Sequence, residues 1–266
     1  MRTMKERPIG MFDSGVGGLS ILRVFLEELP HEDVVYLADT VHFPYGKKTA
    51  EEIEGFGRNI AEHFKKVGVK LVIIACNTAT VYSLKAVQEV MGDIPVIGVI
   101  GAGARAAVES KGESIGVIAT DATIRSHAYS DMIRSLGETA QVTPLATQRL
   151  VTLVEEGDVD SDHARAVIRE DLTPLLDDPP AKLILGCTHF PGLSHLIVEL
   201  LPEVKLIDPA YALVKEASDY LEKENLLRVE GGGKVEFLVT GDPMSFAKNG
   251  SLLLGHPIKD AKKLIL

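Results

Sequence analysis

The segment LVIIACNTAT, residues 71–80, is a short apolar run that ends on a thiol and then turns polar. A run of this length, rich in branched apolar residues, predicts a buried β-strand, and the polar residues after it predict the start of a helix. A second segment, LILGCTHFP at residues 183–191, has the same arrangement. Cys76 and Cys187 in these segments are the only cysteines of the chain. The sequence therefore predicts two equivalent strand ends, each carrying one cysteine.

Predicted strands and helices alternate on both sides of the first segment. Short apolar runs predict strands at residues 7–13, 33–39, 69–75 and 94–100. Residues with helical periodicity lie between the runs, and Thr49 with Glu52 forms a capping box at the start of one helix. Strands that alternate with helices at this spacing are typical of an α/β fold with a mostly parallel sheet.

The pattern restarts in the second half of the chain. Residues 113–123 resemble residues 7–17, and residues 181–190 mirror residues 69–78 in the same order. This repetition predicts two pseudo-symmetric α/β domains, each a mostly parallel sheet flanked by helices, with the active site in the cleft between them. The carboxyl-terminal segment is too short for a third domain. We therefore assign residues 1–98 plus 209–266 to the first domain and residues 99–208 to the second.

The composition narrows the class of protein. The chain has 266 residues, 45% of them hydrophobic and 25% charged, and its net charge is -10. This acidic balance, without a basic stripe, argues against a nucleic acid partner. The amino-terminal MRTMKERPIG lacks the apolar core of a signal peptide, and no apolar run is long enough for a membrane span. We expect a cytoplasmic protein without a disulfide framework.

Polar residues gather at the predicted strand ends together with the two cysteines. The carboxyl ends of parallel strands are where open α/β sheets bind ligands, and the free N–H groups of a helix start favour anions. These positions predict a small, polar pocket that suits a small anionic metabolite. The predicted pocket residues besides the cysteines are Asp13, Ser14, Asn77, Thr78, Thr120, Thr123, Thr188 and His189.

One thiol from each side of a cleft suits the inversion of a stereocentre. A base removes a proton from one face of the carbon, and an acid delivers a proton to the other face. The thiol and thiolate forms of cysteine are both accessible near neutral pH, as acid–base chemistry in both directions requires.

Four segments together resemble the aspartate/glutamate racemase family, whose members need no cofactor. The segments are IGMFDSGVGGLS (9–20), PYG (44–46), ACNTAT (75–80) and GCTHFP (186–191). The resemblance covers nearly the whole chain in matching order, and DSGVGG is most similar to the glutamate-specific members. It implies interconversion of L- and D-glutamate without cofactor or metal, a supply of D-glutamate for peptidoglycan synthesis, and a homodimer.

The resemblance also implies a role for each site residue. Cys76 and Cys187 are the expected acid/base catalysts, with Asp13 tuning Cys76 and His189 tuning Cys187. Glu155 is expected to support His189. By resemblance, Cys76 deprotonates D-glutamate and Cys187 deprotonates L-glutamate. The expected substrate-binding residues are Asp13, Ser14, Tyr45, Gly46, Asn77, Thr78, Thr188 and His189, to which the strand-end position adds Thr120 and Thr123.

Several alternatives remain open at this stage. Cys187 and His189 are also compatible with a metal site, a redox pair with Cys76, or a thiol hydrolase. The Gly-rich loop is compatible with phosphate binding, and Asp13 with a simple helix cap. A racemase for aspartate or hydantoins, or a non-catalytic protein that binds a dicarboxylate, would fit the same pocket. Proton exchange at Cα distinguishes a racemase from the hydrolase and the binding protein.

Overall fold

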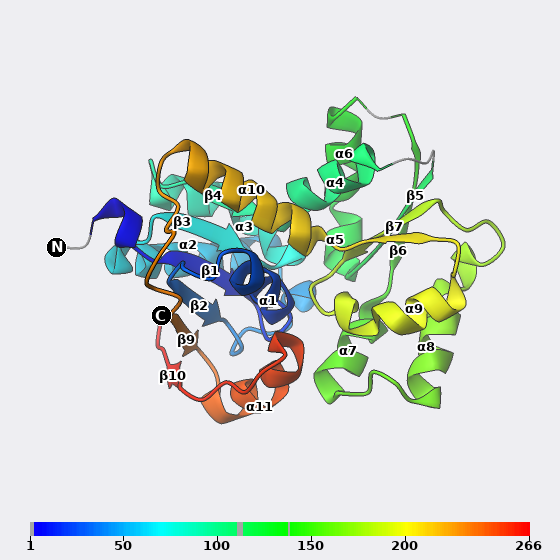
Figure 1. Cartoon of the computed structure of the whole chain (residues 1–266). Helices are drawn as coiled ribbons and strands as arrows, with labels where there is room; N and C mark the ends of the chain where they lie inside the picture. Colours follow the sequence, from blue (N-terminus) through cyan, green and yellow to red (C-terminus); the bar gives the residue numbers. More distant parts are fainter. Residues whose placement is uncertain (1–2, 111–113, 138) are drawn as a thin grey trace.

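The computed structural model describes residues 3–110, 114–137 and 139–266, and these form two parallel sheets flanked by helices (Figure 1). Within these residues, the larger sheet has the strand order β10-β9-β2-β1-β3-β4 and the smaller one β6-β5-β7-β8. The strands are β1 Ile9–Asp13, β2 Val34–Ala38, β3 Leu71–Ile74, β4 Val96–Gly98, β5 Ser114–Ala119, β6 Gln141–Ala146, β7 Lys182–Gly186, β8 Lys205–Ile207, β9 Val235–Val239 and β10 Ala261–Lys263. The predicted fold class is confirmed.

The helices connect the strands as the alternating pattern predicts. The longer ones are α1 Leu19–Glu28, α2 Ala50–Val67, α3 Asn77–Met91, α4 Val99–Glu109, α8 Asp162–Leu172, α10 Pro209–Lys223 and α11 Pro243–Leu254. The shorter ones are α5 Asp121–Arg125, α6 Ala128–Ser135, α7 Gln148–Glu156 and α9 Ser194–Leu200, with 3-10 turns η1 Met4–Glu6, η2 Tyr45–Lys47, η3 Thr173–Leu175 and η4 Phe190–Leu193. No helix of the described segments combines the length and apolar character that a bilayer crossing requires.

Local sequence signals explain where individual helices begin. The capping box of α2 is confirmed, because Glu52 N–H donates to Thr49 Oγ1 at 3.2 Å and Thr49 N–H donates to Glu52 Oε2 at 2.8 Å. Asp208 caps α10, and Pro209 occupies the first helical position, where no N–H is needed. These contacts fix the helix starts at the ends of the strands.

The larger sheet is buried on both faces. Ile73 of β3 packs into one apolar cluster together with helix α1, whereas Ile74 packs into a second cluster together with α2 and α3. All residues of β1, β2 and β3 are buried. Such near-continuous apolar strands are expected where helices cover both faces of a parallel sheet. The burial leaves the carboxyl ends of these strands as the place for polar groups.

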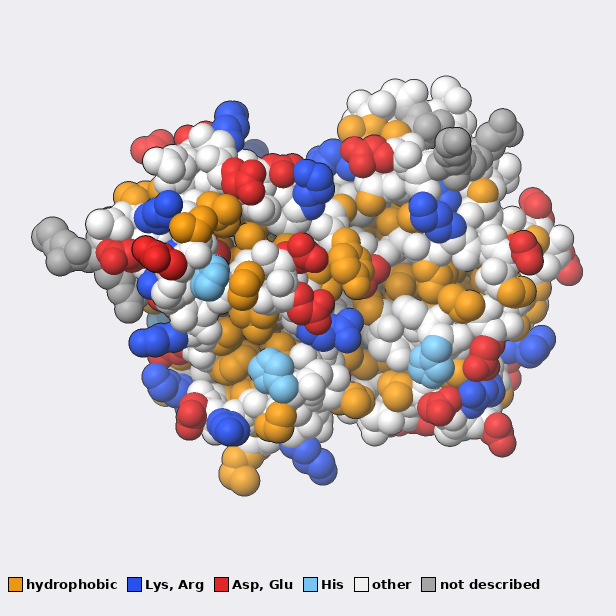
Figure 2. Space-filling view, viewed as in Figure 1, with side chains coloured by type: hydrophobic (Ala, Val, Ile, Leu, Met, Phe, Trp, Pro, Cys, Tyr) orange, Lys and Arg blue, Asp and Glu red, His pale blue; other side chains and the backbone are white. Residues whose placement is uncertain are grey.

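The carboxyl-terminal segment returns to the larger sheet, where β9 pairs in parallel with β2. Helix α10 lies over the half that contains the larger sheet, runs toward the other half and packs against both α1 and α4 (Figure 1). Acidic and basic side chains are mixed over this face of the molecule (Figure 2). The return segment thus joins elements that are far apart in the sequence.

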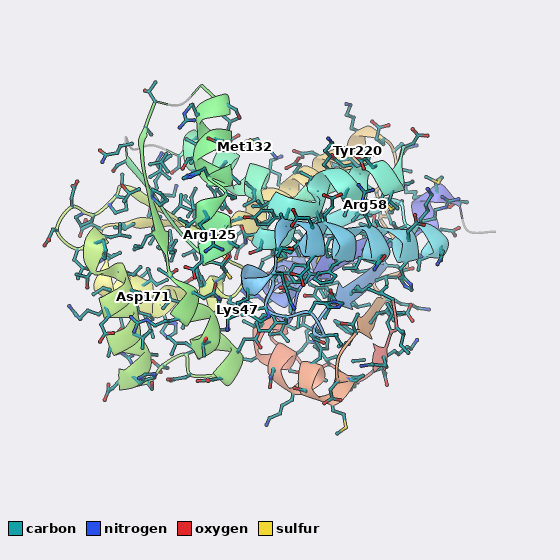
Figure 3. All side chains as sticks on the ribbon, turned by 180° about the vertical axis from the view of Figure 1, so that it is seen from behind. Lys47, Arg58, Arg125, Met132, Asp171 and Tyr220 are labelled. Atoms are coloured by element: carbon teal, nitrogen blue, oxygen red, sulfur yellow. The ribbon has the colours of Figure 1, made fainter. Side chains whose placement is uncertain are left out.

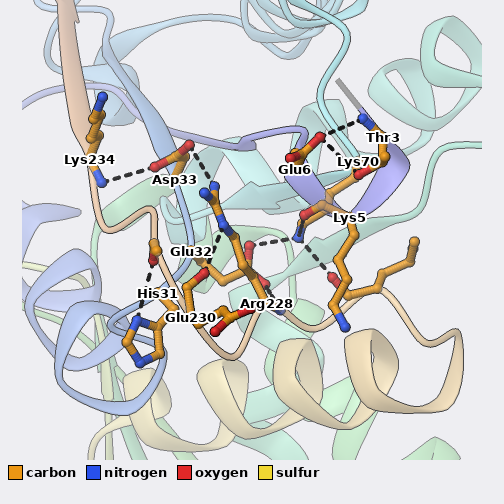
Figure 4. A network of polar contacts seen from close by, with 12 residues as sticks. Thr3, Lys5, Glu6, His31, Glu32, Asp33, Lys70, Arg228, Glu230 and Lys234 are labelled. Atoms are coloured by element: carbon orange, nitrogen blue, oxygen red, sulfur yellow. Dashed lines mark hydrogen bonds and ion pairs between the residues drawn. The ribbon is translucent and has the colours of Figure 1, made fainter. Parts of the chain in front are cut away.

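A buried ion pair anchors the return segment (Figure 4). Lys70 Nζ lies 2.6 Å from Glu32 Oε2, and both side chains are almost fully buried. Lys70 also donates to the carbonyl oxygens of Lys5 and Leu226, while Glu32 Oε1 accepts the N–H of Arg228 at 2.8 Å. The pair therefore satisfies three backbone groups from two separate segments, which is how a buried charge pair becomes tolerable.

Two expectations about local structure were wrong. The predicted strand 94–100 ends at Gly98, and Val99 begins α4, because a short apolar run does not distinguish a strand from a buried helix. The residues after Cys187 form a turn and the 3-10 helix η4 before α9 begins, whereas those after Cys76 begin the long helix α3 directly. The two cysteine segments therefore differ more in structure than they do in sequence.

Candidate active site

Side chains from both halves of the molecule enclose one pocket at the carboxyl ends of the strands. Its empty volume is about 350 Å³, which includes space open to solvent. Both cysteines line it, so the structure brings the two predicted catalysts together. The remaining lining residues are Asp13, Ser14, Phe43, Pro44, Tyr45, Gly46, Asn77, Thr78, Thr120, Gln148, Val151, Thr188 and His189.

Cys76 caps the amino terminus of helix α3. Its Sγ accepts the N–H of Ala79 at 3.4 Å and lies 3.7 Å from the hydroxyl of Ser14. Burial raises the pKa of the Cys76 thiol well above its ordinary value, and the nearby charge of Asp13 raises it further. Cys76 is therefore held as a neutral thiol, which is the form that donates a proton.

Asp13 ends strand β1 beside this thiol. Its Oδ2 accepts the N–H groups of Gly15 and Gly18 at 3.2 and 2.9 Å. Its Oδ1 is buried and has no hydrogen-bond partner among the described residues. Burial raises the pKa of Asp13, partly offset by the charge of His189. The carboxyl group is thus a loop cap and also a pocket residue with one oxygen unpaired.

Cys187 follows strand β7 and has a different set of partners. Its Sγ lies 3.5 Å from Nδ1 of His189, whose Nε2 lies 2.7 Å from Oε1 of Glu155. Burial lowers the pKa of His189, but the anionic forms of Cys187 and Glu155 outweigh burial and raise it to about 10. His189 is therefore an imidazolium at neutral pH, donating one N–H toward the sulfur of Cys187 and the other to Glu155.

The glycine-rich loop of the first half approaches this second cysteine segment closely. A Cβ on Gly17 would lie 2.3 Å from Oγ1 of Thr188 and 2.7 Å from the ring of His189. The hydroxyl of Ser20 donates to the carbonyl oxygen of Thr188 at 2.9 Å. Only a residue without a side chain fits at Gly17, so the loop positions the two halves of the pocket against each other.

Hydroxyl and amide groups join the two halves on the Cys76 side. The hydroxyl of Thr78 lies 3.0 Å from that of Thr120 and 3.2 Å from that of Thr123. Tyr129 OH donates to Oδ1 of Asn77 at 2.7 Å. Thr123 contacts the other two threonines but does not line the pocket, so its predicted binding role becomes a supporting one.

The loop after β2 closes the pocket from another side. Tyr45 is buried, and its hydroxyl donates to Oδ2 of Asp39 at 2.6 Å. Asp39 also accepts from Nδ1 of His42 and from the hydroxyl of Thr240. The Tyr45 hydroxyl is thus occupied by the protein, although Tyr45 and Gly46 both line the pocket. η2 packs against α5 of the other half, and Lys47 marks this junction in Figure 3.

Some pocket residues were not predicted from the sequence. Phe43, Gln148 and Val151 line the pocket, yet no residue pattern distinguishes them from ordinary loop and helix positions, and Pro44 of the PYG segment also lines it. Glu155 lies outside the lining and contacts Nε2 of His189. No group of three potential metal ligands occurs among the described residues.

The family model, the sequence relatives and the solved structures that match this chain agree with one another. Residues 17–217 match the model of the Asp/Glu/Hydantoin racemase family. The glutamate racemase of Microcystis aeruginosa is 41% identical over 256 residues, which cover 96% of this chain and 90% of the relative. That of Thermoanaerobacter pseudethanolicus is 39% identical and covers 97% of each chain. The crystal structure of the Francisella tularensis glutamate racemase in complex with D-glutamate superposes with a TM-score of 0.93 at 36% identity and covers 98% of each chain. The chain therefore belongs to the Asp/Glu/hydantoin racemase family.

Proposed function

We propose that this protein is a glutamate racemase that interconverts L- and D-glutamate by proton transfer at Cα between two cysteines. The observation that supports it best is the pair of buried thiols that reach one pocket from opposite halves of the molecule. The relatives named glutamate racemase, matched over nearly the full chain, support glutamate as the substrate.

In the proposed direction from L- to D-glutamate, Cys187 is the base. Its thiolate, stabilised by the imidazolium of His189, takes the Cα proton and becomes a thiol. The electron pair left on Cα is delocalised into the substrate carboxyl group. The Cys76 thiol then delivers its proton to the opposite face of Cα and becomes a thiolate. The reverse reaction exchanges the two roles, so no proton is gained or lost overall.

Asp13 is proposed to act on the Cys76 thiol, and Glu155 is proposed to act on the Cys187 side through His189. The carboxyl group of Asp13, whose pKa is raised by burial, is suited to accept a proton from the Cys76 side and return it. Glu155 holds the ring of His189 in orientation and favours its charged form. Each thiol therefore has its own positioning group, as a two-base reaction needs.

Neutral donors are proposed to bind the substrate carboxylates. The pocket lining contains no lysine or arginine among the described residues. The N–H groups at the start of α3 carry a partial positive charge that suits an anion, and Asn77, Thr78 and Thr188 offer polar side chains beside the cysteines. Ser14, Tyr45, Gly46 and Thr120 complete the proposed binding residues.

Four further assignments are also proposals: the cellular location, the oligomeric state, the biological role and the division into domains. We propose that the protein acts in the cytoplasm as a homodimer and supplies D-glutamate for peptidoglycan synthesis. We also propose that residues 1–98 plus 209–266 and residues 99–208 are its two domains. The pairing of β9 with β2 and the separate sheet of β5 to β8 support this division.

Isotope exchange tests the proposal directly. Purified protein, without added pyridoxal phosphate and with a metal chelator present, is incubated with L-glutamate in D₂O and followed by NMR and polarimetry. We expect loss of the Cα proton signal together with decay of optical rotation. Early in the reaction, deuterium should appear in the D-enantiomer before it appears in the remaining L-enantiomer, because separate bases act on the two faces.

Two variants and a second substrate sharpen the test. Cys76→Ser and Cys187→Ser should each lose racemisation, because serine is a much weaker acid than a thiol. Full turnover in either variant would exclude the two-thiol reaction. Absence of exchange with both enantiomers of glutamate, but exchange with aspartate, would make the protein an aspartate racemase.

A further inference from the structure

Gln148 presents an unpaired polar atom at the pocket. It is the first residue of α7, it is half-buried, and its side chain is part of the pocket lining. Its Oε1 is buried and has no hydrogen-bond partner among the described residues. A buried polar atom without a partner costs free energy, so a group of this kind beside a cavity indicates a ligand contact.

The surroundings of Gln148 define one corner of the pocket. A Cβ on Gly46 would lie 3.0 Å from Gln148 Oε1 and 3.7 Å from Cβ of Thr120. The amide therefore faces the glycine of the loop after β2, across from the start of α5. The absence of a side chain at Gly46 leaves this corner open.

The pocket lining divides into two groups of residues. One group belongs to the three segments that carry or adjoin the thiols: residues 13–14, 76–78 and 187–189. In the proposed reaction Cα lies between the thiols, so this group surrounds Cα and its substituents. The other group comprises residues 43–46, Thr120, Gln148 and Val151, and it is left to receive the substrate side chain.

Within this second group, the other polar side chains are already occupied. The hydroxyl of Tyr45 donates to Asp39, and the hydroxyl of Thr120 lies within hydrogen-bond distance of Thr78 and Thr123. Gln148 is the remaining side chain with hydrogen-bonding groups. A half-turn of its amide about the Cγ–Cδ bond presents the NH₂ group where Oε1 now lies, and NH₂ is a donor for carboxylate oxygens.

We propose that Gln148 is a specificity-determining residue that donates a hydrogen bond to the side-chain carboxylate of the substrate. This inference rests on the proposed function, because it takes the position of Cα from the two-thiol reaction. A neutral amide binds the carboxylate without forming an ion pair. It also leaves the charges of Asp13 and His189 near the thiols undisturbed.

Steady-state kinetics of Gln148→Ala test the inference. The matched control is Thr152→Ala, an exposed position on the same helix. A hydrogen bond to a charged group is worth about tenfold or more in affinity. We therefore expect the KM for both enantiomers of glutamate to rise about tenfold or more, with kcat changed less than about threefold. Inhibition by L-2-aminobutyrate, which lacks the side-chain carboxylate, should not change. Thr152→Ala should behave as the wild type.

A substitution that introduces a negative charge adds a second, independent readout. In Gln148→Glu the new carboxylate repels that of the substrate, so KM should rise further than in the alanine variant. Equal KM values in Gln148→Ala and Thr152→Ala, with the wild type active on glutamate, would overturn the inference alone. An equal loss of affinity for glutamate and aminobutyrate would also overturn it, because Gln148 would then contact the Cα end or support the fold. A wild-type protein that exchanges no Cα proton of glutamate would overturn the proposed function as well.

Discussion

Replacing Glu155 with glutamine removes one of the two anions that keep His189 protonated. Glutamine keeps the shape and an oxygen acceptor, so the 2.7 Å contact to Nε2 should survive without its charge. A hydrogen bond to a charged group contributes about 1.5–3 kcal/mol, and one pKa unit corresponds to about 1.4 kcal/mol. Because the anion favours the imidazolium, its loss should lower the pKa of His189 by about one to two units. The value should therefore fall from about 10 in the wild type to about 8–9 in the variant.

The kinetic consequence depends on pH. At pH 9 about nine-tenths of His189 is protonated with a pKa of about 10, and about one-tenth to one-half is protonated in the variant. If the imidazolium stabilises the Cys187 thiolate, kcat/KM should fall about two- to ninefold more at pH 9 than at pH 7. Because the two enantiomers have equal free energy, the fall must be the same in both directions.

NMR titration of protein labelled with ¹⁵N-histidine measures this pKa, with the His189 signals assigned from a His189→Asn variant. Glu156→Gln is the matched control, because it removes the same charge at an exposed neighbouring position. Steady-state rates between pH 7 and 9.5 accompany the titration. A pKa of His189 that is unchanged in Glu155→Gln, or shifted equally by the control, would refute the assigned role of the Glu155 contact.

Two further substitutions test packing and folding. Gly17→Ala should reduce kcat/KM at least about tenfold while the protein still folds, because its Cβ would meet Oγ1 of Thr188 at 2.3 Å. Circular dichroism and kinetics measure this, and wild-type kinetics would contradict the close approach; Gly55→Ala, with no atom within 4 Å, is the control. Lys70→Met should lower the free energy of unfolding by about 3–5 kcal/mol in urea denaturation, because it leaves a buried carboxylate without its cation. Lys262→Met, which breaks the exposed pair with Glu236, should lower the free energy of unfolding much less by the same measurement, and similar losses at both sites would contradict this account.

The features that the sequence predicts well are those set by local chemistry. The capping box at Thr49 and the Asp208–Pro209 helix start depend on neighbouring residues only, and both are present. Buried parallel strands require continuous apolar runs, so strands β1 to β3 were visible in the sequence. The meeting of the two cysteines was predictable because each follows a strand of one of the two sheets, and the carboxyl ends of both sheets were expected to face one cleft.

The features that were missed depend on which segments meet in space. Gln148 has no local signal, since a glutamine at a helix start is ordinary, and only its approach to Gly46 places it in the pocket. Tyr129 likewise bonds to Asn77 from a distant helix. The hydroxyl of Tyr45 donates to Asp39, and no spacing in the sequence indicates that contact.

The two cysteine segments look symmetric in sequence, but their surroundings are not symmetric in the folded protein. Burial and the charge of Asp13 raise the pKa of Cys76 and favour its thiol, whereas Nδ1 of the His189 imidazolium lies 3.5 Å from the sulfur of Cys187. In the proposed reaction, this arrangement suits Cys187 as the base that deprotonates L-glutamate and Cys76 as the acid. Each conversion to the D-enantiomer leaves the opposite form, with a thiol at Cys187 and a thiolate at Cys76. Before the next turnover in that direction, Cys76 must regain one proton and Cys187 must lose one, and the raised pKa of Cys76 favours the first of these two transfers.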